Sequence, residues 1–315
     1  MKANNTHGKL MLARLNVSKW YARTFDAKAT AEVAQNHGND IGRYNKRLLP
    51  KHCPSYDAVA AAERKAREAF NKFTLPYDAF EVRLAPTKAY ADIMSTLKDA
   101  QAVFEVAVDN FMREYRSADP AKCIRELARL EQNGLFNERD YPPAEEVADA
   151  FGMKIAFLPF PDAEAYGIDL PADQQGAIAL SVQAALDEAR ERATVELRDR
   201  IVGATSRLAE ALTKAAAGKG KLYDCHFDAV AEAVELLPKL NVFDDAKVAA
   251  AVNHARVLAG LNADAVRGSL GAKSRAAQQV TAVAKSVADT FAIDIGDLLG
   301  NEFGEGQCDL LSALA

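Results

Sequence analysis

The sequence has few cysteines and no long apolar run. Its four cysteines (Cys53, Cys123, Cys225 and Cys308) are scattered along the chain, which is typical of a reducing compartment and argues against a dense disulfide framework. No apolar stretch approaches the roughly 18 residues that a membrane-spanning helix needs. The N-terminus also has no apolar signal region. These absences predict a cytoplasmic protein that makes no membrane contact.

The motifs of common catalytic and cofactor sites are missing as well. The chain has no Walker A loop, no G-x-G-x-x-G after a strand, no G-x-S-x-G elbow and no H-E-x-x-H. The run Gly218-Lys219-Gly220-Lys221 follows a predicted helix, whereas a phosphate loop follows a strand. We therefore predict no catalytic residue and no cofactor.

Two kinds of polar pair could still carry chemistry. They are the dipeptides His52-Cys53 and Cys225-His226 as metal ligands, and Asp224 with His226 or Asp140 with Tyr141 as acid–base pairs. The spacing of the dipeptides matches no common zinc pattern, and adjacent residues of an extended segment point to opposite sides. Acid–base pairs of this kind occur by chance in any helical protein of this size. We predict no metal site.

Proline is absent from residues 172–217, and that stretch has a strong helical pattern. Apolar residues recur at Ile178, Val182, Ala185, Ala189, Ala193, Leu197, Ile201, Ala204, Leu208, Leu212 and Ala215. The mean interval is about 3.7 residues, close to the helical period. The pattern predicts one helix from Pro171 to about Ala217, on the order of 70 Å long. Gly176 and Gly203 are its expected kink points, and Gly218 ends it.

The rest of the chain is also mostly helical in pattern. We predict strands at 10–20, 80–84 and 154–158, and further helices at 26–38, 54–73, 86–117, 119–134, 143–151, 226–237, 245–261 and 263–291. The fold class is therefore mainly α, with a long central helix, antiparallel helical packing and a small accessory β-sheet in the N-terminal half. The last helix is expected to pack back on the long one.

One predicted helix carries a heptad-like seam. Tyr90, Leu97, Phe104 and Phe111 fall seven residues apart, which is the spacing of a coiled coil. The seam is compatible with one helix of an antiparallel hairpin inside the chain and with a dimeric coiled coil. The hairpin is the favoured interpretation.

Charge is unevenly distributed, and it divides the chain into three regions. Residues 1–52 contain ten Lys or Arg and three acidic residues, a net charge of +7. Because the net charge of the whole chain is −5, the remaining residues carry a net charge of −12. No basic residue follows Lys285. We predict a basic α+β region at 1–170, a helical-bundle region at 171–292 and a flexible acidic tail at 293–315.

The basic head mixes cations with aromatic rings. Cations contact phosphates and flat rings stack on exposed bases, so this mixture is what single-strand binding requires. Trp20, Tyr21, Phe25 and Tyr44 lie among the basic residues. The candidate nucleic-acid-binding residues are Lys9, Arg14, Lys19, Trp20, Arg23, Arg43, Tyr44, Lys46 and Arg47. The alternative is a solvated basic face with the aromatic rings in the core.

The tail has the composition of a recruitment peptide, because it is acidic and ends in small apolar side chains. Its candidate partner-binding residues are Asp309, Leu310, Leu311 and Leu314. Such a tail could also compete with nucleic acid for a basic surface. Simple terminal disorder is the alternative.

Four short patterns are spread over most of the chain. They are Leu15-Asn16-Val17 with Trp20, Thr74-Leu75-Pro76-Tyr77, Gly134-Leu135-Phe136-Asn137 with Asp140-Tyr141-Pro142, and Leu237-Pro238-Lys239-Leu240-Asn241 with Asp244-Asp245. Together they resemble an uncharacterised phage and prophage protein family with no assigned activity. Genes of that kind often stand beside MoxR-type AAA+ ATPases, so the resemblance implies an ATPase partner and the cytoplasm of a bacterial host.

Three functions follow, in order of preference. The first is a non-catalytic, homo-oligomeric helical scaffold or adaptor of phage type that acts with an ATPase or a nucleoprotein. The second is a factor in phage replication or recombination that binds single-stranded nucleic acid through the basic head. An enzyme of unrecognised class comes third.

Overall fold

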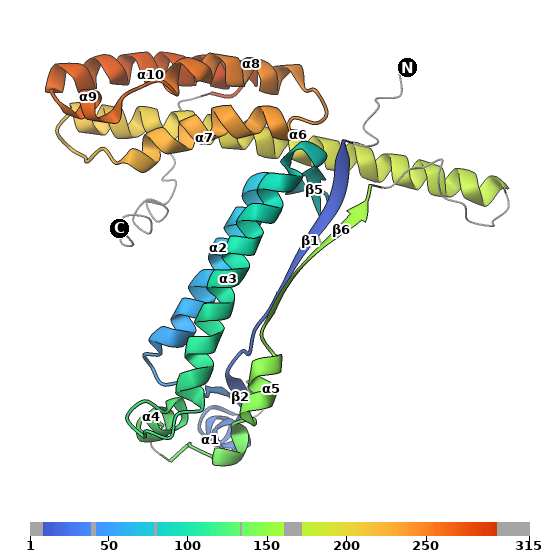
Figure 1. Cartoon of the computed structure of the whole chain (residues 1–315), viewed down its shortest axis with the longest axis vertical. Helices are drawn as coiled ribbons and strands as arrows, with labels where there is room; N and C mark the ends of the chain where they lie inside the picture. Colours follow the sequence, from blue (N-terminus) through green and yellow to red (C-terminus); the bar gives the residue numbers. More distant parts are fainter. Residues whose placement is uncertain (1–8, 39–41, 79–80, 133, 161–171, 295–315) are drawn as a thin grey trace. The chain divides into compact units, whose positions relative to one another are not determined.

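The computed structural model describes residues 9–38, 42–78, 81–132, 134–160 and 172–294 (Figure 1). These residues form ten α-helices and six β-strands. The longest helix, α6, spans Ala172–Ala216, and a small sheet lies in the N-terminal half. The predicted fold class is confirmed. The candidate tail residues Asp309, Leu310, Leu311 and Leu314 lie outside the described residues.

The chain folds into two compact units that alternate along the sequence. One, which we call the bundle unit, contains Met1–Ala13, Phe73–Tyr90 and Phe157–Ala315. The other, the ribbon unit, contains Arg14–Lys72 and Ala91–Ala156. The sequence instead predicted three regions, 1–170, 171–292 and 293–315. Charge and composition change near residue 170, but they do not reveal that early strands share a core with late helices.

Helix α6 is continuous through both glycines that were expected to kink it. It has 45 residues and no break at Gly176 or Gly203. The predicted apolar stripe is buried from Ala189 onward, and Leu208 is fully buried. The helix ends just before Gly218, whose positive φ of 71° suits a residue without a Cβ.

Four further helices pack with α6 in the bundle unit. They are α7 (Asp224–Leu240), α8 (Ala246–Ala255, extended by a 3₁₀ turn at Arg256–Leu258), α9 (Ala263–Arg267) and α10 (Leu270–Thr290). Helix α10 lies along α6, as predicted, and successive long helices run antiparallel (Figure 1). Their buried side chains join those of α6 in a single core.

Two helix boundaries in this unit differ from the prediction. Pro238 was expected to end α7, yet the helix continues to Leu240; a proline so near the C-terminus removes one late hydrogen bond only. Residues 263–291 were expected to form one helix, but α9 ends before Gly268. The Ser269 side chain then accepts the backbone N–H of Ala272 at 3.1 Å and starts α10.

The four-stranded sheet has the order β4-β5-β1-β6. Its strands are β1 (Leu10–Ser18), β4 (Leu75–Pro76), β5 (Arg83–Pro86) and β6 (Gly152–Pro159). β1 and β4 each pair antiparallel with β5, with Leu12 and Leu75 both opposite Leu84. Leu75 and Leu84 are fully buried in the bundle core. The strand predicted at 80–84 therefore exists but starts later, at Arg83.

Two arginines join this sheet to α6 within the bundle unit. The Arg83 Nε donates to Thr74 Oγ1 at 2.7 Å, and the Arg200 guanidinium donates to the Thr74 carbonyl at 3.0 Å. Arg200 is also paired with Glu196 at 2.9 Å. Burial lowers the pKa of Arg83 to about 10, so its guanidinium stays charged at neutral pH. The Thr74 backbone is thus held by charged donors where α2 ends.

The core of the ribbon unit is aromatic and forms around two long helices, α2 (Pro54–Phe73) and α3 (Tyr90–Tyr115). The fully buried Phe111 ring of α3 lies 5.5 Å from Tyr56 of α2 and 6.2 Å from Trp20. Phe104 is buried beside them. Leu97, Phe104 and Phe111 of the heptad-like seam are therefore buried inside the chain, which favours the hairpin interpretation, whereas Tyr90 is 44% exposed.

Two short helices complete the ribbon unit, α4 (Ile124–Glu131) and α5 (Ala144–Asp149). Asp119-Pro120 was predicted to begin a helix there. Instead Asp119 closes a turn, with its side chain accepting the Ala121 N–H at 3.0 Å and its carbonyl accepting the Lys122 N–H at 3.0 Å. The helix begins only at Ile124, which is buried.

We expect Leu208→Ala to destabilise the bundle unit by about 2 to 5 kcal/mol, because it opens a cavity in the core around α6. Leu180→Ala on the same helix is the matched control. Leu180 is 74% exposed, so its loss should cost less than about 0.5 kcal/mol. Urea unfolding followed by circular dichroism measures both. Equal effects of the two changes would contradict the buried stripe.

Candidate nucleic-acid interface

Five of the nine candidate residues of the basic head lie on or beside a two-stranded ribbon: Arg23, Arg43, Tyr44, Lys46 and Arg47. Strand β2 (Arg23–Phe25) pairs antiparallel with β3 (Asn45–Arg47), and the short helix α1 (Ala27–His37) lies between them in the sequence. The Leu48 N–H donates to the Ala22 carbonyl at 2.8 Å and the Asp26 N–H to the Tyr44 carbonyl at 3.0 Å. These bonds extend the pairing at both ends. We call β2, β3 and these flanking residues the ribbon.

Strand alternation gives the ribbon two chemically different faces. Arg23 is paired with Arg47, Thr24 with Lys46, and Phe25 with Asn45. Residues opposite one another in an antiparallel pair point to the same side, and successive residues point to opposite sides. Arg23, Phe25, Asn45 and Arg47 are exposed, whereas Lys46 is buried. We call the exposed side the outer face.

The inner face is held by one buried lysine. The Lys46 ammonium lies 3.3 Å from Asp26 Oδ2 and 2.5 Å from Asp140 Oδ2, and it donates to the Leu135 carbonyl. Burial disfavours the charged lysine, but the hydrogen bonds to Asp140 and Asp26 prevail and raise the pKa of Lys46. Only 5% of Lys46 is exposed, so it cannot reach a phosphate. This candidate residue is structural.

Asp26 connects the same lysine to α1. Its Oδ1 accepts the backbone N–H of Ala29 at 2.9 Å, which caps the helix as predicted. The bond to Ala29, together with the contact to Lys46, lowers the pKa of the Asp26 carboxyl. Asp140 lies in a 3₁₀ turn at Glu138–Asp140. One ammonium therefore holds the ribbon, the start of α1 and this turn together.

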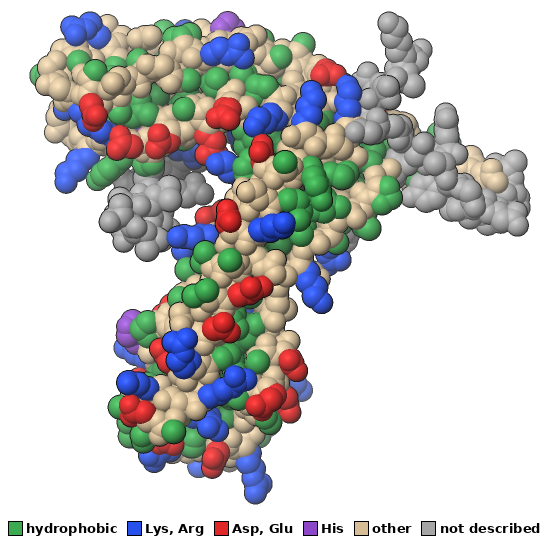
Figure 2. Space-filling model, in the orientation of Figure 1, with side chains coloured by type: hydrophobic (Ala, Val, Ile, Leu, Met, Phe, Trp, Pro, Cys, Tyr) green, Lys and Arg blue, Asp and Glu red, His purple; other side chains and the backbone are tan. Residues whose placement is uncertain are grey.

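The outer face carries arginines without carboxylate partners. Among the described residues no ion pair involves Arg23 or Arg47 on this face or Arg43 beside it, and all three are exposed; the exposed Arg14 also has none, but it lies on β1 and not on the ribbon. Arg23 and Arg47 stand directly opposite each other, an arrangement that is destabilising for like charges. An anion bound between them would relieve that repulsion. Figure 2 shows Lys and Arg side chains at this end of the ribbon unit, with acidic side chains among them.

Aromatic rings are exposed on and beside the ribbon. Tyr21 is 78% exposed, Phe25 49% and Tyr44 44%. The Arg43 guanidinium lies over the Phe25 ring, 5.6 Å from its centroid, within cation–π range. Ala22, buried between Tyr21 and Arg23, has a positive φ of 52°. This uncommon backbone conformation makes a turn at Ala22, between the partly buried Trp20 and the exposed start of β2.

The structure separates Trp20, Lys19 and Lys9 from the outer face. The Trp20 ring packs edge-on against Tyr115 at 5.5 Å in the ribbon-unit core. Lys19 is paired with Glu63 at 2.6 Å, and that hydrogen bond raises its pKa. Lys9 belongs to the bundle unit, where it lies 3.6 Å from Asp244. Phe25 and Tyr21, which the candidate set omitted, occupy the exposed positions instead.

The polar pairs considered for catalysis or metal binding have structural partners. Asp224 is paired with Arg267 at 2.5 Å, and His226 Nδ1 accepts the Tyr223 N–H at the start of α7. Asp140 contacts Lys46. His52-Cys53 and Cys225-His226 belong to different units. Within the described ranges no group of three His, Cys, Asp or Glu side chains is placed to hold a metal ion.

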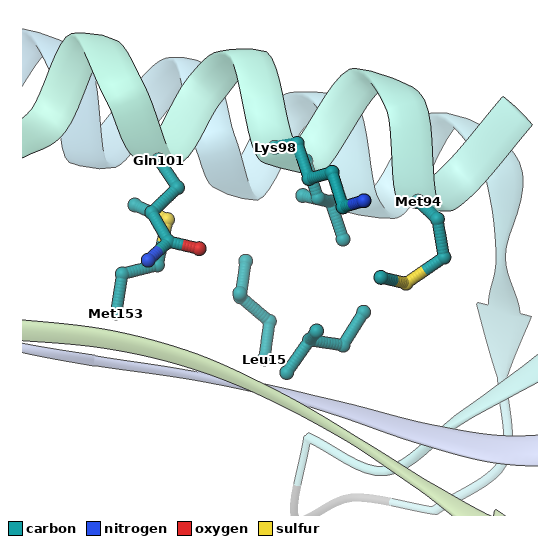
Figure 3. A pocket seen from close by; sticks show the side chains of 7 residues that line it. Leu15, Met94, Lys98, Gln101 and Met153 are labelled. Carbon is teal, nitrogen blue, oxygen red and sulfur yellow. The ribbon is translucent and has the colours of Figure 1, made fainter.

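A small apolar crevice lies between α3, β1 and β6 in the ribbon unit (Figure 3). It is lined by Leu15, Met94, Leu97, Lys98, Gln101, Met153 and Ile155. Its volume is about 30 Å³, enough for about one water molecule. No helix in the described part of the chain has the length and apolarity to span a membrane.

We expect Lys46→Met to destabilise the ribbon unit by about 3 to 5 kcal/mol, because it leaves two carboxylates without their cation. Lys51→Met, at a nearby exposed lysine, is the control and should change the unfolding free energy by less than about 0.5 kcal/mol. Chemical denaturation monitored by Trp20 fluorescence reports on this unit, since the partly buried Trp20 packs against its core. Similar stabilities of the two variants would show that Lys46 is not structural.

Comparisons of the chain with protein-family models, with curated proteins and with solved structures found no match. The resemblance to a phage and prophage family therefore stays a prediction.

Proposed function

We propose that this protein binds nucleic acid through the outer face of the ribbon. The observation that carries the proposal is the juxtaposition of Arg23 and Arg47, exposed and opposite each other, without carboxylate partners among the described residues. Arg43 adjoins them, since its guanidinium lies over the exposed ring of Phe25. Arginine pairs with phosphate oxygens through a planar fork of donors, so this surface matches the chemistry of a sugar–phosphate backbone.

The same observation favours nucleic-acid binding over the scaffold function that the sequence alone favours. From the sequence, the basic head could equally be a solvated face with its aromatic rings in the core. Trp20 fits that alternative, since it is partly buried and packs against the core. Phe25 does not, because about half of it remains exposed, with the Arg43 guanidinium over its ring. This mixture supports nucleic-acid binding over a purely solvated face.

We expect Arg23→Gln with Arg47→Gln to weaken binding to a fluorescent oligonucleotide on the order of tenfold at about 0.1 M salt. The slope of log affinity against log salt becomes shallower by about 0.7 for each phosphate contact that the protein loses with a single strand. The double change removes two such contacts, so the slope should become shallower by about 1.4. Fluorescence anisotropy across a salt series measures both quantities.

The control is Arg64→Gln with Lys65→Gln. It removes the same charge from an exposed turn of α2, where Arg64 already lies 3.8 Å from Glu68. The control should keep the wild-type slope. No binding by the wild-type protein at low salt, or equal losses in the two double variants, would refute the proposal.

We keep a second candidate, the helical scaffold or adaptor that acts as a homo-oligomer with an AAA+ ATPase partner. The length of α6 favours it. The buried core of the bundle unit takes its α6 residues from Ala193 onward, although the helix begins about twenty residues earlier. Leu180 in that first part is 74% exposed. An apolar side chain on a projecting helix is available for contact with another chain.

Light scattering tests this second candidate. We expect a mass above that of one chain, and Leu180→Glu should lower it because a buried charge is costly at an interface. Ser181→Glu adds the same charge one residue along, on a different side of the helix, and should leave the mass unchanged. A monomeric wild-type protein would exclude the oligomeric scaffold.

A further inference from the structure

We infer that Phe25 is a stacking position for an unpaired base, so that the ligand of the ribbon is single-stranded. This inference rests on the proposed function and adds the class of nucleic acid that the same surface takes.

Phe25 is an unusual residue to leave exposed in a short strand. It points to the outer face, 49% exposed, and it belongs to neither of the two hydrophobic cores. Its cross-strand neighbour is the exposed, polar Asn45. The contact identified on its ring is with the guanidinium of Arg43. A large ring on a polar face contributes little to folding, whereas a planar ligand could use it.

The arginines around Phe25 are placed to contact the phosphates of a single nucleic-acid strand. Arg23 lies two residues before Phe25 on the same side of β2, about 6.6 Å away along the strand. Arg47 stands opposite Arg23. A nucleotide carries its phosphate and its base at opposite ends of the sugar, so a phosphate bound by Arg23 and Arg47 would bring an adjoining base towards Phe25.

A stacked duplex cannot use this position in the same way. Bases in a duplex present their edges in the grooves, and their faces are covered by neighbouring bases. A ring that stacks needs a free base face, which single strands offer and which every base possesses. The favoured ligand is therefore a single strand, with little dependence on its sequence.

Arg43 has a defined place in this arrangement. Its guanidinium now covers the Phe25 ring at a distance of 5.6 Å. An arriving base would enter between the two planar groups, with the phenyl ring on one face and the guanidinium on the other. Arginine planes and aromatic rings both stack on unpaired bases, so the pair would hold the base from both sides.

The test compares two labelled oligomers of equal length and charge, by fluorescence anisotropy with the full-length protein at low salt. One is oligothymidine, and the other is an abasic deoxyribose-phosphate chain. The wild-type protein should bind oligothymidine about 5- to 150-fold more tightly, which is the range for stacking one base. Phe25→Leu should reduce the affinity for oligothymidine to that for the abasic chain. It should leave binding of the abasic chain unchanged.

Phe25→Tyr keeps a ring and should retain the preference for oligothymidine, which separates stacking from a general disturbance of the ribbon. Equal binding of the two oligomers by the wild-type protein, or an equal loss for both in Phe25→Leu, would overturn the stacking position while leaving the proposed function intact. Failure of the wild-type protein to bind either oligomer would instead refute the proposed function itself.

Discussion

The arrangement of the ribbon depends on the burial of one ammonium group. Lys46 lies between the carboxylates of Asp26 and Asp140 and contacts the Leu135 carbonyl. Since side chains alternate along a strand, placing Lys46 inward forces its neighbours Asn45 and Arg47 outward. The pairing of β3 with β2 then places Arg23 and Phe25 on that same outer side. A buried ion cluster thus decides which cations face solvent.

The two units obtain their cores in different ways. The bundle unit buries aliphatic side chains of α6, α7, α8 and α10, with Leu10, Leu75 and Leu84 from the strands added to them. The ribbon unit buries aromatic rings, with Phe111 in contact with Tyr56, Trp20 and Phe151. Helices rich in alanine have small side chains and pack closely along their length. A few large rings, in contrast, can fill the space between a helical hairpin and short irregular elements.

Sequence patterns predicted the long elements well because their signals are local. Helix α2 begins and ends at the predicted residues 54 and 73, and Asp26 caps α1 as expected. Predicted helix boundaries were wrong where they depended on a single residue type, as at Pro238 and at Asp119-Pro120. The site was harder to predict. A strand of three residues is too short to show alternation, and the partner that buries Lys46, Asp140, lies far along the chain. The same limit left Trp20 in the candidate set in place of Phe25.

The alternation of the two units along the chain has a consequence for synthesis. Leu10 emerges from the ribosome long before Val280 and Val287, yet the three belong to the same core. Contacts between such distant positions form slowly, because a long loop must close before they contribute. The ribbon unit uses residues between 14 and 156 only, so its chain is complete long before the bundle unit can close. The surface proposed to bind nucleic acid would then be folded while the helical bundle is still being translated.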